Sequence, residues 1–298
     1  MPPGNMTDSP QAIDYVERWR RIVAARREQH DAVCAGEGRT TSDYWARRAE
    51  GYAKFVREAA SGEDPFVASV LRHLRPGDTV LDVGAGTGRH AIPLARHAGR
   101  VIALDPSAAM LGYLRDEAAS QGLSNIDIIE GAWPEAADRA PQADIVVSAH
   151  VLYPIEDVVP FLRALDRHAG RLCFLNLMVW PPWFDQLGLW EAVHPDSSGR
   201  VPQPTYIDAV NVLHQLGCYA NVEVAWVETR HAFDSLNDAV ERFAESVAVG
   251  DNPERLQRLR EALAERLQPL GDGRLAHPRR RYPLATVWWE AGALRAEA

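Results

Sequence analysis

Val80-Leu81-Asp82-Val83-Gly84-Ala85-Gly86-Thr87-Gly88-Arg89 is a short apolar run that ends in three glycines at alternate positions. A segment compatible with a helix, Arg89 to His97, follows at once. Glycine allows a backbone with positive φ and a close approach to a ligand. The start of a helix behind such a turn supplies free N–H groups for a polar or anionic group. The stretch therefore predicts a strand, a tight turn and a helix that together bind a ligand.

The glycine spacing separates two classes of cofactor. A dinucleotide-binding turn needs G-x-G-x-x-G, and the place of its last glycine is Arg89 here, which counts against a nicotinamide dehydrogenase. The glycines instead run G-x-G-x-G, with the acidic Asp82 two positions before the first. This arrangement resembles the first motif of the class I (Rossmann-like) S-adenosylmethionine-dependent methyltransferases. The resemblance implies S-adenosylmethionine as the cofactor and methyl transfer as the reaction.

The segments that follow agree with an alternating β/α fold. Asp105 ends a second short apolar run and lies 17 residues beyond Gly88, about the length of one crossover helix and a turn. An acidic residue at this place can accept hydrogen bonds from both ribose hydroxyls. Because helical segments separate the strands, the pattern predicts right-handed βαβ units and a parallel sheet. The later strands are expected at Ile126 to Glu130, Ala143 to His150, Arg171 to Met178, Val222 to Val227 and Tyr282 to Trp289.

The fold class implied by the resemblance is α/β: a three-layer α/β/α sandwich around a seven-stranded, mostly parallel sheet. Its strand order is 3-2-1-4-5-7-6, and its last strand is antiparallel. Extra helices precede the first strand, so we expect a helical cap over residues 1–64 and the methyltransferase domain over 65–298. Insertions at about 179–206 and 235–270 are long for loops in a compact domain and are expected to wall a substrate pocket.

Composition narrows the partners. The net charge of −9 argues against a polyanion-binding surface, so no nucleic acid partner is expected. The sequence contains no apolar run of membrane-spanning length, and Met1 to Pro10 lacks a signal-peptide core, so we expect a cytoplasmic protein without a membrane partner. The three cysteines are far apart and lack metal-ligand spacing, so no metal site is expected. The expected assembly is a monomer or homodimer.

The resemblance assigns the cofactor residues position by position. Asp82 would orient the turn or reach the cofactor's ammonium group through water, and Asp105 would hold the ribose. The third motif departs from the family, because Ala132 stands where a carboxylate often receives the adenine amino group. Backbone groups near Ala132 are then expected to hold the adenine, with Trp133 either stacking on it or serving as a core residue. The predicted cofactor set is Asp82, Gly84, Ala85, Gly86, Gly88, Asp105, Pro106, Gly131, Ala132, Trp133 and His150.

The segment Ser148 to Tyr153 resembles the family motif that borders both cofactor and substrate. Two roles stay open for His150: a general base, since its ordinary pKa is near neutrality, and a positioning role, which we favour. Tyr153 is a second catalytic candidate. His194 is a third, although it could equally be a histidine of a surface loop.

Aromatic residues are frequent around the expected pocket. Such walls suit an apolar or flat aromatic molecule, or a cationic nitrogen, although about half of these side chains are expected to be core. We therefore expect methylation of a small molecule. The alternatives are an RNA or protein methyltransferase of the same fold and a non-catalytic S-adenosylmethionine-binding protein. The predicted pocket residues are Tyr44, Trp45, Tyr52, Trp180, Trp183 and Trp190.

Overall fold

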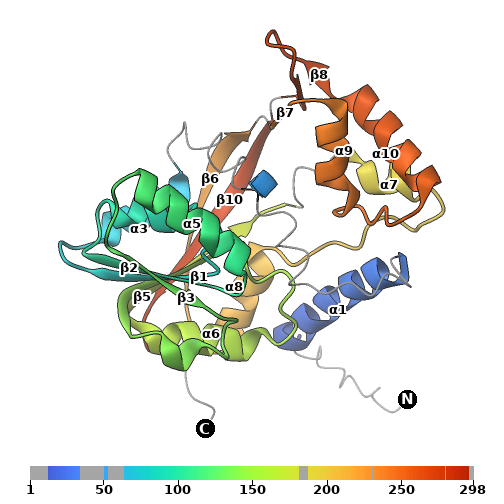
Figure 1. Cartoon of the computed structure of the whole chain (residues 1–298). Helices are drawn as coiled ribbons and strands as arrows, with labels where there is room; N and C mark the ends of the chain where they lie inside the picture. The colour runs from blue at the N-terminus through green and yellow to red at the C-terminus, as the bar shows by residue number, and fades with distance from the viewer. Residues whose placement is uncertain are drawn as a thin grey trace, which may run out of the picture.

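The computed structural model describes residues 13–33, 50–52, 64–180, 187–229, 231–278 and 280–294. A seven-stranded sheet in the order β3-β2-β1-β4-β5-β10-β6 forms its centre (Figure 1). Neighbours among the first five strands pair in parallel, whereas β10 is antiparallel to both β5 and β6. This confirms the predicted strand order, with β10 as the predicted seventh strand. The strands are β1 (Thr79–Val83), β2 (Arg100–Asp105), β3 (Ile126–Glu130), β4 (Ala143–Ala149), β5 (Ala169–Met178), β6 (Asn221–Thr229) and β10 (Arg280–Glu290).

Helices cover both faces of this sheet, because its central strands are apolar on both sides. Val80 of β1 belongs to a core shared with one helical layer, while its neighbour Leu81 belongs to the core on the other face. The first layer holds α3 (Pro65–His73), α4 (Ala91–Ala95) and α5 (Ala108–Ser120). The second layer holds α1 (Tyr15–Val33), α6 (Val158–His168) and α8 (Tyr206–Gln215). The three-layer sandwich is thus confirmed.

The N-terminal helix α1 is part of the second layer. Trp19 is fully buried there, and its indole N–H donates to the carbonyl of Ile155 at 2.7 Å. Between α1 and α3, residues 34–49 and 53–63 lie outside the described residues, and residues 50–52 are helical. The domain boundary between residues 64 and 65 stays a prediction.

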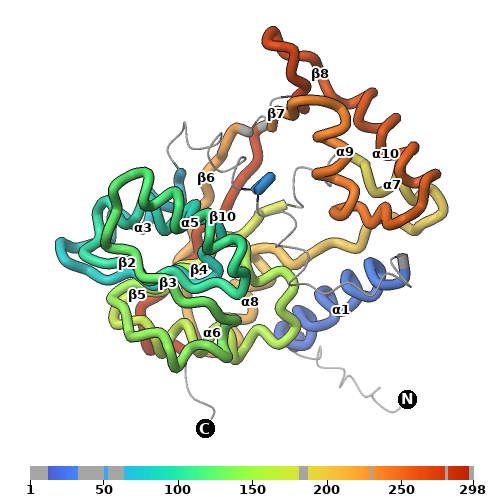
Figure 2. The backbone as a smooth tube through the Cα atoms, in the orientation of Figure 1, coloured from blue at the N-terminus to red at the C-terminus, as the bar shows by residue number. Residues whose placement is uncertain are grey.

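Two segments that are separated in sequence, residues 187–194 and 232–276, together form what we call the insertion unit. It contains α7 (Leu189–Val193), α9 (Leu236–Ala244), α10 (Pro253–Arg266) and a small sheet of β7 (Ala232–Phe233), β9 (Leu275–Ala276) and β8 (Gln268–Pro269). Helix α8 and strand β6 lie between these two segments in sequence and belong to the central domain. The insertion unit has its own apolar core, which includes Leu189, Val240 and Leu263. Figures 1 and 2 show it beyond the end of the sheet at which β10 begins.

Candidate functional site

The glycine turn after β1 needs its glycines for two reasons. Gly84, Gly86 and Gly88 have φ of +79°, +53° and +88°, in the left-handed region that side chains disfavour. Space is also short, since a Cβ on Gly84 would lie 2.2 Å from Cγ2 of Val151. The turn therefore packs against the residue that follows His150, which brings the ends of β1 and β4 together.

Asp105, at the end of β2, ties the turn to the next helix. Its two carboxylate oxygens accept hydrogen bonds from the N–H of Gly86 at 2.9 Å and of Ser107 at 2.8 Å. Burial raises the pKa of Asp105 above its ordinary value, against a smaller lowering by these two N–H groups. Each oxygen keeps a second lone pair, so the carboxylate can still accept from neighbouring hydroxyl groups of a ligand. That capacity fits a ribose.

Asp82 is the unusual group of the turn. It is 1% exposed, and within the described part of the chain neither carboxylate oxygen has a hydrogen-bond partner of ordinary geometry. Burial and then the charge of Asp105 raise the pKa of Asp82 to about 7, against a smaller lowering by the amide of Ala91. The hydroxyl of Thr87 in the same turn is also buried and lacks a partner among the described residues. Such orphaned groups fit a ligand that brings a donor or a cation.

His150 directly follows β4 in an uncommon backbone conformation, with φ of +60°. Its Nδ1 lies 3.1 Å from the hydroxyl of Tyr153, which accepts a hydrogen bond from the N–H of Met178 at 2.9 Å. Burial, followed by the charges of Arg89 and His90, lowers the pKa of His150 to about 3. A histidine with this pKa is neutral near pH 7. A pKa this low makes His150 a weak base, and both roles that the sequence left open stay predictions.

Arg89 and Asp64 also belong to this region, although neither is among the residues predicted from the sequence. Nη2 of Arg89 lies 3.1 Å from Oδ2 of Asp64, whose other oxygen caps α3 by accepting from the N–H of Phe66 at 2.9 Å. Burial raises the pKa of Asp64, but His90 and Arg89 hold it well below its usual range. The sequence feature that could have identified Arg89 is its place directly after the last glycine of a ligand-binding turn.

The adenine-side predictions have a mixed outcome. Pro106 and Ala132 are exposed at the ends of the adjacent strands β2 and β3, and the N–H of Gly131 donates to the carbonyl of Asp105 at 3.0 Å. Trp133 instead lies in the core. It is 7% exposed, its indole N–H donates to the carbonyl of Phe161, and its ring packs edge-on against His168. We therefore do not assign adenine stacking to Trp133. Ala85 is buried within the turn.

His194 and Trp190 pack inside the insertion unit. Nε2 of His194 lies 2.7 Å from the carbonyl of Val247, so this nitrogen carries the proton and cannot act as a base. The ring of Trp190 packs against His194 at 4.4 Å and is 3% exposed. The structure thus gives His194 a packing role instead of the predicted catalytic one, and it makes Trp190 a core residue instead of a pocket wall.

The remaining aromatic predictions divide by position. Trp180 follows β5, is 52% exposed and packs edge-on against Trp226 of β6. Tyr52 is half-buried in the helical segment 50–52. Tyr44, Trp45 and Trp183 lie outside the described residues.

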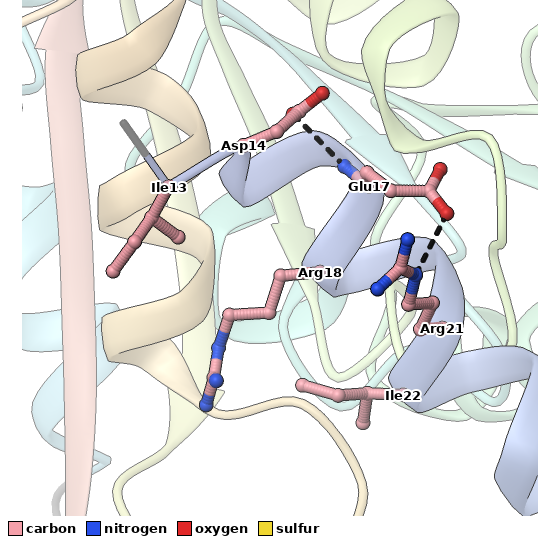
Figure 3. Close-up of a pocket in the computed structure, with 6 residues that line it drawn as sticks. All are labelled: Ile13, Asp14, Glu17, Arg18, Arg21 and Ile22. Carbon is pink, nitrogen blue, oxygen red and sulfur yellow. Dashed lines mark hydrogen bonds and ion pairs between the residues drawn. The ribbon is translucent and has the colours of Figure 1, made fainter. Parts of the chain in front are cut away.

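A separate hollow of about 540 Å³ lies on α1 and is lined by Ile13, Asp14, Glu17, Arg18, Arg21 and Ile22 (Figure 3). Its charged groups all have partners: Glu17 pairs with Arg21 at 2.9 Å, Asp14 accepts from the N–H of Glu17, and Arg18 pairs with Asp208 of α8 at 3.4 Å. Because α1 packs on α8 and α6, away from the glycine turn, we assign no catalytic role to this hollow.

The described residues show no sign of a metal site or of a membrane span. They contain no group of three or more His, Cys, Asp or Glu side chains suited to a metal ion. Among them, no helix is both long and apolar enough to span a membrane.

The chain is similar to proteins of known family. Residues 80–170 match the family model described as a methyltransferase domain. An uncharacterized protein of Haemophilus influenzae is 27% identical over 221 residues, which cover 73% of this chain and 78% of that protein. A putative methyltransferase of Bacillus halodurans is similar in fold, with a TM-score of 0.51, 15% identity, and coverage of 76% of this chain and 99% of that one.

Shorter matches reach methyltransferases with different acceptors. A protein-L-isoaspartate O-methyltransferase of Methylorubrum populi is 36% identical over 45% of this chain and 63% of its own length. A ubiquinone biosynthesis O-methyltransferase of Azorhizobium caulinodans is 33% identical over 37% of this chain and 42% of its own length. The chain thus spans less than two thirds of either enzyme.

Proposed function

We propose that this chain, which is an S-adenosylmethionine-dependent methyltransferase of the class I fold, methylates a small molecule. The observation that carries the proposal is the insertion unit, which has its own core and lies beyond the end of the sheet at which β10 begins (Figure 1). Tyr52 interacts electrostatically with Arg89 after the glycine turn and with Tyr282 of β10. A unit at this place would restrict the approach of a large acceptor and suit a small one.

The residues of the turn have distinct proposed roles toward the cofactor. When bound, S-adenosylmethionine supplies an electrophilic methyl group on a sulfonium. Asp105 would accept hydrogen bonds from the ribose hydroxyls while it holds the turn through Gly86. Asp82 would balance the ammonium group of the methionine part, which would give its orphaned carboxylate a partner. Backbone groups near Ala132 would hold the adenine.

On the acceptor side, orientation and exclusion of water contribute most to the rate, because the electrophile is already activated. His150 would orient a reacting group as a neutral donor. Its low pKa suits an acceptor that is nucleophilic without losing a proton to this residue. Tyr153 would hold the imidazole in place.

Two other functions remain to be tested against this one. Methylation of a protein or RNA is the first, since matched relatives include a protein methyltransferase and a 23S rRNA methyltransferase of Pseudomonas fluorescens. The net charge of −9 disfavours RNA, because phosphate contacts dominate such binding. A non-catalytic cofactor-binding protein is the second.

The first experiment is calorimetric titration with S-adenosylhomocysteine, with NAD and NADP as controls. Micromolar binding of S-adenosylhomocysteine alone is expected. A methyl-transfer screen then compares phenols, amines and carboxylic acids with peptides and with ribosomal RNA. Turnover confined to small molecules would support the proposal, whereas turnover of a peptide or RNA would replace it. Binding without turnover of any class would favour the non-catalytic protein.

A further inference from the structure

Arg89 has hydrogen-bonding capacity that the described residues do not use. Its side chain is 23% exposed, and its ion pair with Asp64 engages only Nη2. Within the described residues the other guanidinium N–H groups make no hydrogen bond. The partner carboxylate is committed as well, since Asp64 also caps α3 and faces His90. The ion pair therefore anchors Arg89 and leaves a donor edge for a further anion.

Arg89 interacts electrostatically with residues from four other parts of the fold. Besides burial, it lowers the pKa of His150, and after burial and His277 it lowers that of His231. Burial raises the pKa of Tyr282 on β10, and Arg89 lowers it. Tyr52 also interacts electrostatically with Arg89 and with Tyr282. Arg89 is thus central to a group of side chains contributed by separate elements.

The position of this group separates it from the ribose end of the cofactor site. In the sheet order, β4 and β5 lie between β1 and β10, whereas β2 with Asp105 lies on the opposite side of β1. Strands are about 4.8 Å apart, so β10 lies about 14 Å from β1. Arg89 pairs with Asp64, the N-cap of α3, and α3 packs against β10, so this charge lies on the β10 side of the glycine turn, where an acceptor beside His150 would bind.

The balance of charges selects the kind of anion. His150 and His231 are neutral near pH 7, since the pKa of each is lowered to about 3. The positive charge of Arg89 is opposed by the single negative charge of Asp64. This pair tolerates one added negative charge better than two, which disfavours a phosphate dianion. The planar fork of a guanidinium also matches a carboxylate with two hydrogen bonds.

We propose that Arg89 binds a carboxylate of the methyl acceptor, so that the substrate is a small carboxylic acid with a nucleophilic oxygen or nitrogen. The inference rests on the proposed small-molecule function and deepens it. It makes Arg89 a specificity-determining residue on the acceptor side, and it assigns the exposed part of the guanidinium to the substrate.

The test compares Arg89→Met with the wild type on matched acceptor pairs, 4-hydroxybenzoate against 4-hydroxybenzamide and glycine against glycinamide. Loss of a charged hydrogen-bonded pair lowers kcat/KM for the acid by about 10- to 100-fold. The acid-to-amide ratio should fall toward one, while the Kd of S-adenosylhomocysteine stays within about threefold. Arg100→Met is the matched control, because Arg100 pairs with Asp127 at the opposite edge of the sheet.

Arg89→Lys keeps the positive charge and serves as a second test if Arg89→Met does not fold. It should retain part of the preference for acids, because an ammonium lacks the bidentate fork. Loss of S-adenosylhomocysteine binding in folded Arg89 variants would overturn the inference and assign Arg89 to the carboxylate of the cofactor. A wild-type enzyme that uses amides as well as acids, or uses neither, would also overturn it. Failure of the wild type to bind S-adenosylhomocysteine would instead contradict the cofactor assignment.

Discussion

The hydroxyl of Tyr153 lies 3.1 Å from Nδ1 of His150 and accepts a hydrogen bond from the amide of Met178. Because the hydroxyl has one proton, it can donate that proton to Nδ1 only if Nδ1 is unprotonated. Among the described residues the hydroxyl proton has no other acceptor, so we infer the neutral tautomer with the proton on Nε2. This links the ends of β4 and β5 and makes His150 a donor of fixed orientation.

Tyr153→Phe should release this tautomer. We expect kcat to fall about tenfold with little change in S-adenosylhomocysteine affinity, because orientation is lost on the acceptor side. The amide of Met178 would lose its partner, at a cost of about 1–3 kcal/mol in the free energy of unfolding. Long-range ¹H–¹⁵N NMR of His150 reports the tautomer directly. Tyr219→Phe is the control, since Tyr219 is 79% exposed. An unchanged tautomer in Tyr153→Phe would contradict the assignment.

His150 should also shape the dependence of stability on acid. Its pKa is lowered to about 3 in the folded state, from an ordinary value of 6.5. Between these values the unfolded chain binds a proton that the folded chain does not, so stability is complete above pH 6.5 and is lost as the pH falls toward 3. His150→Gln should flatten this decline in denaturant unfolding measured from pH 7 to pH 4. His231, which titrates in the same window, will leave a residual slope. Equal slopes for wild type and variant would contradict the lowered pKa.

Asp82 should have the opposite effect on the pH dependence of stability. Its pKa rises to about 7 on folding, so the folded apoprotein holds a proton that the unfolded chain has released, and stability falls as pH rises from about 4 to 7. Asp82→Asn should therefore gain melting temperature relative to the wild type as the pH rises to 8. A cationic ligand group needs the ionised carboxylate, so wild-type affinity for S-adenosylhomocysteine should increase from pH 6 to 8. Calorimetry should find weaker binding without this increase in the variant. The same pH dependence in both proteins would contradict the role of Asp82.

At Gly86 the backbone conformation, and not a lack of space, is the reason that a glycine is needed. A Cβ there would meet only Cε of Met110 at 3.6 Å, which is ordinary contact, but φ is +53°. Gly86→Val should abolish S-adenosylhomocysteine binding, because a β-branched residue resists this conformation. Gly86→Asn should bind better than Gly86→Val, since asparagine tolerates the left-handed region. Asp105→Ala, which removes the acceptor for the ribose and for Gly86, should also abolish binding. Normal binding by both Gly86→Val and Asp105→Ala would refute the cofactor site.

His194→Ala tests the packing role of the insertion unit. The variant loses the hydrogen bond to Val247 and the contact with Trp190. Its free energy of unfolding should therefore be about 1–3 kcal/mol lower than that of the wild type. Its kcat and KM at a temperature where it is folded should match the wild type. A large fall in kcat with unchanged stability would restore His194 as a catalytic residue.

The cofactor half of the site could be predicted from the sequence because its signals are local. Three alternate glycines, an acidic residue before them and Asp105 one crossover later specify a strand, a turn and a second strand end. Parallel pairing then brings Asp105 to Gly86, as the hydrogen bond between them shows. The Trp133 prediction could not be resolved in this way, because its burial depends on α6, which is contributed by a later segment.

The acceptor half depends on contacts between residues distant in sequence. Arg89 meets Asp64 of the preceding helix cap and acts on His150, His231 and Tyr282, which follow it by 61, 142 and 193 residues. No periodicity relates these positions. The sequence determined the alternation of strands and helices and the cofactor turn, since both follow from short-range backbone and apolar patterns, whereas the strand order came from the family resemblance. The neighbours of Arg89, the tautomer of His150 and the burial of His194 arise only when helices and strands pack, because packing sets which polar groups lose water and which partners they meet.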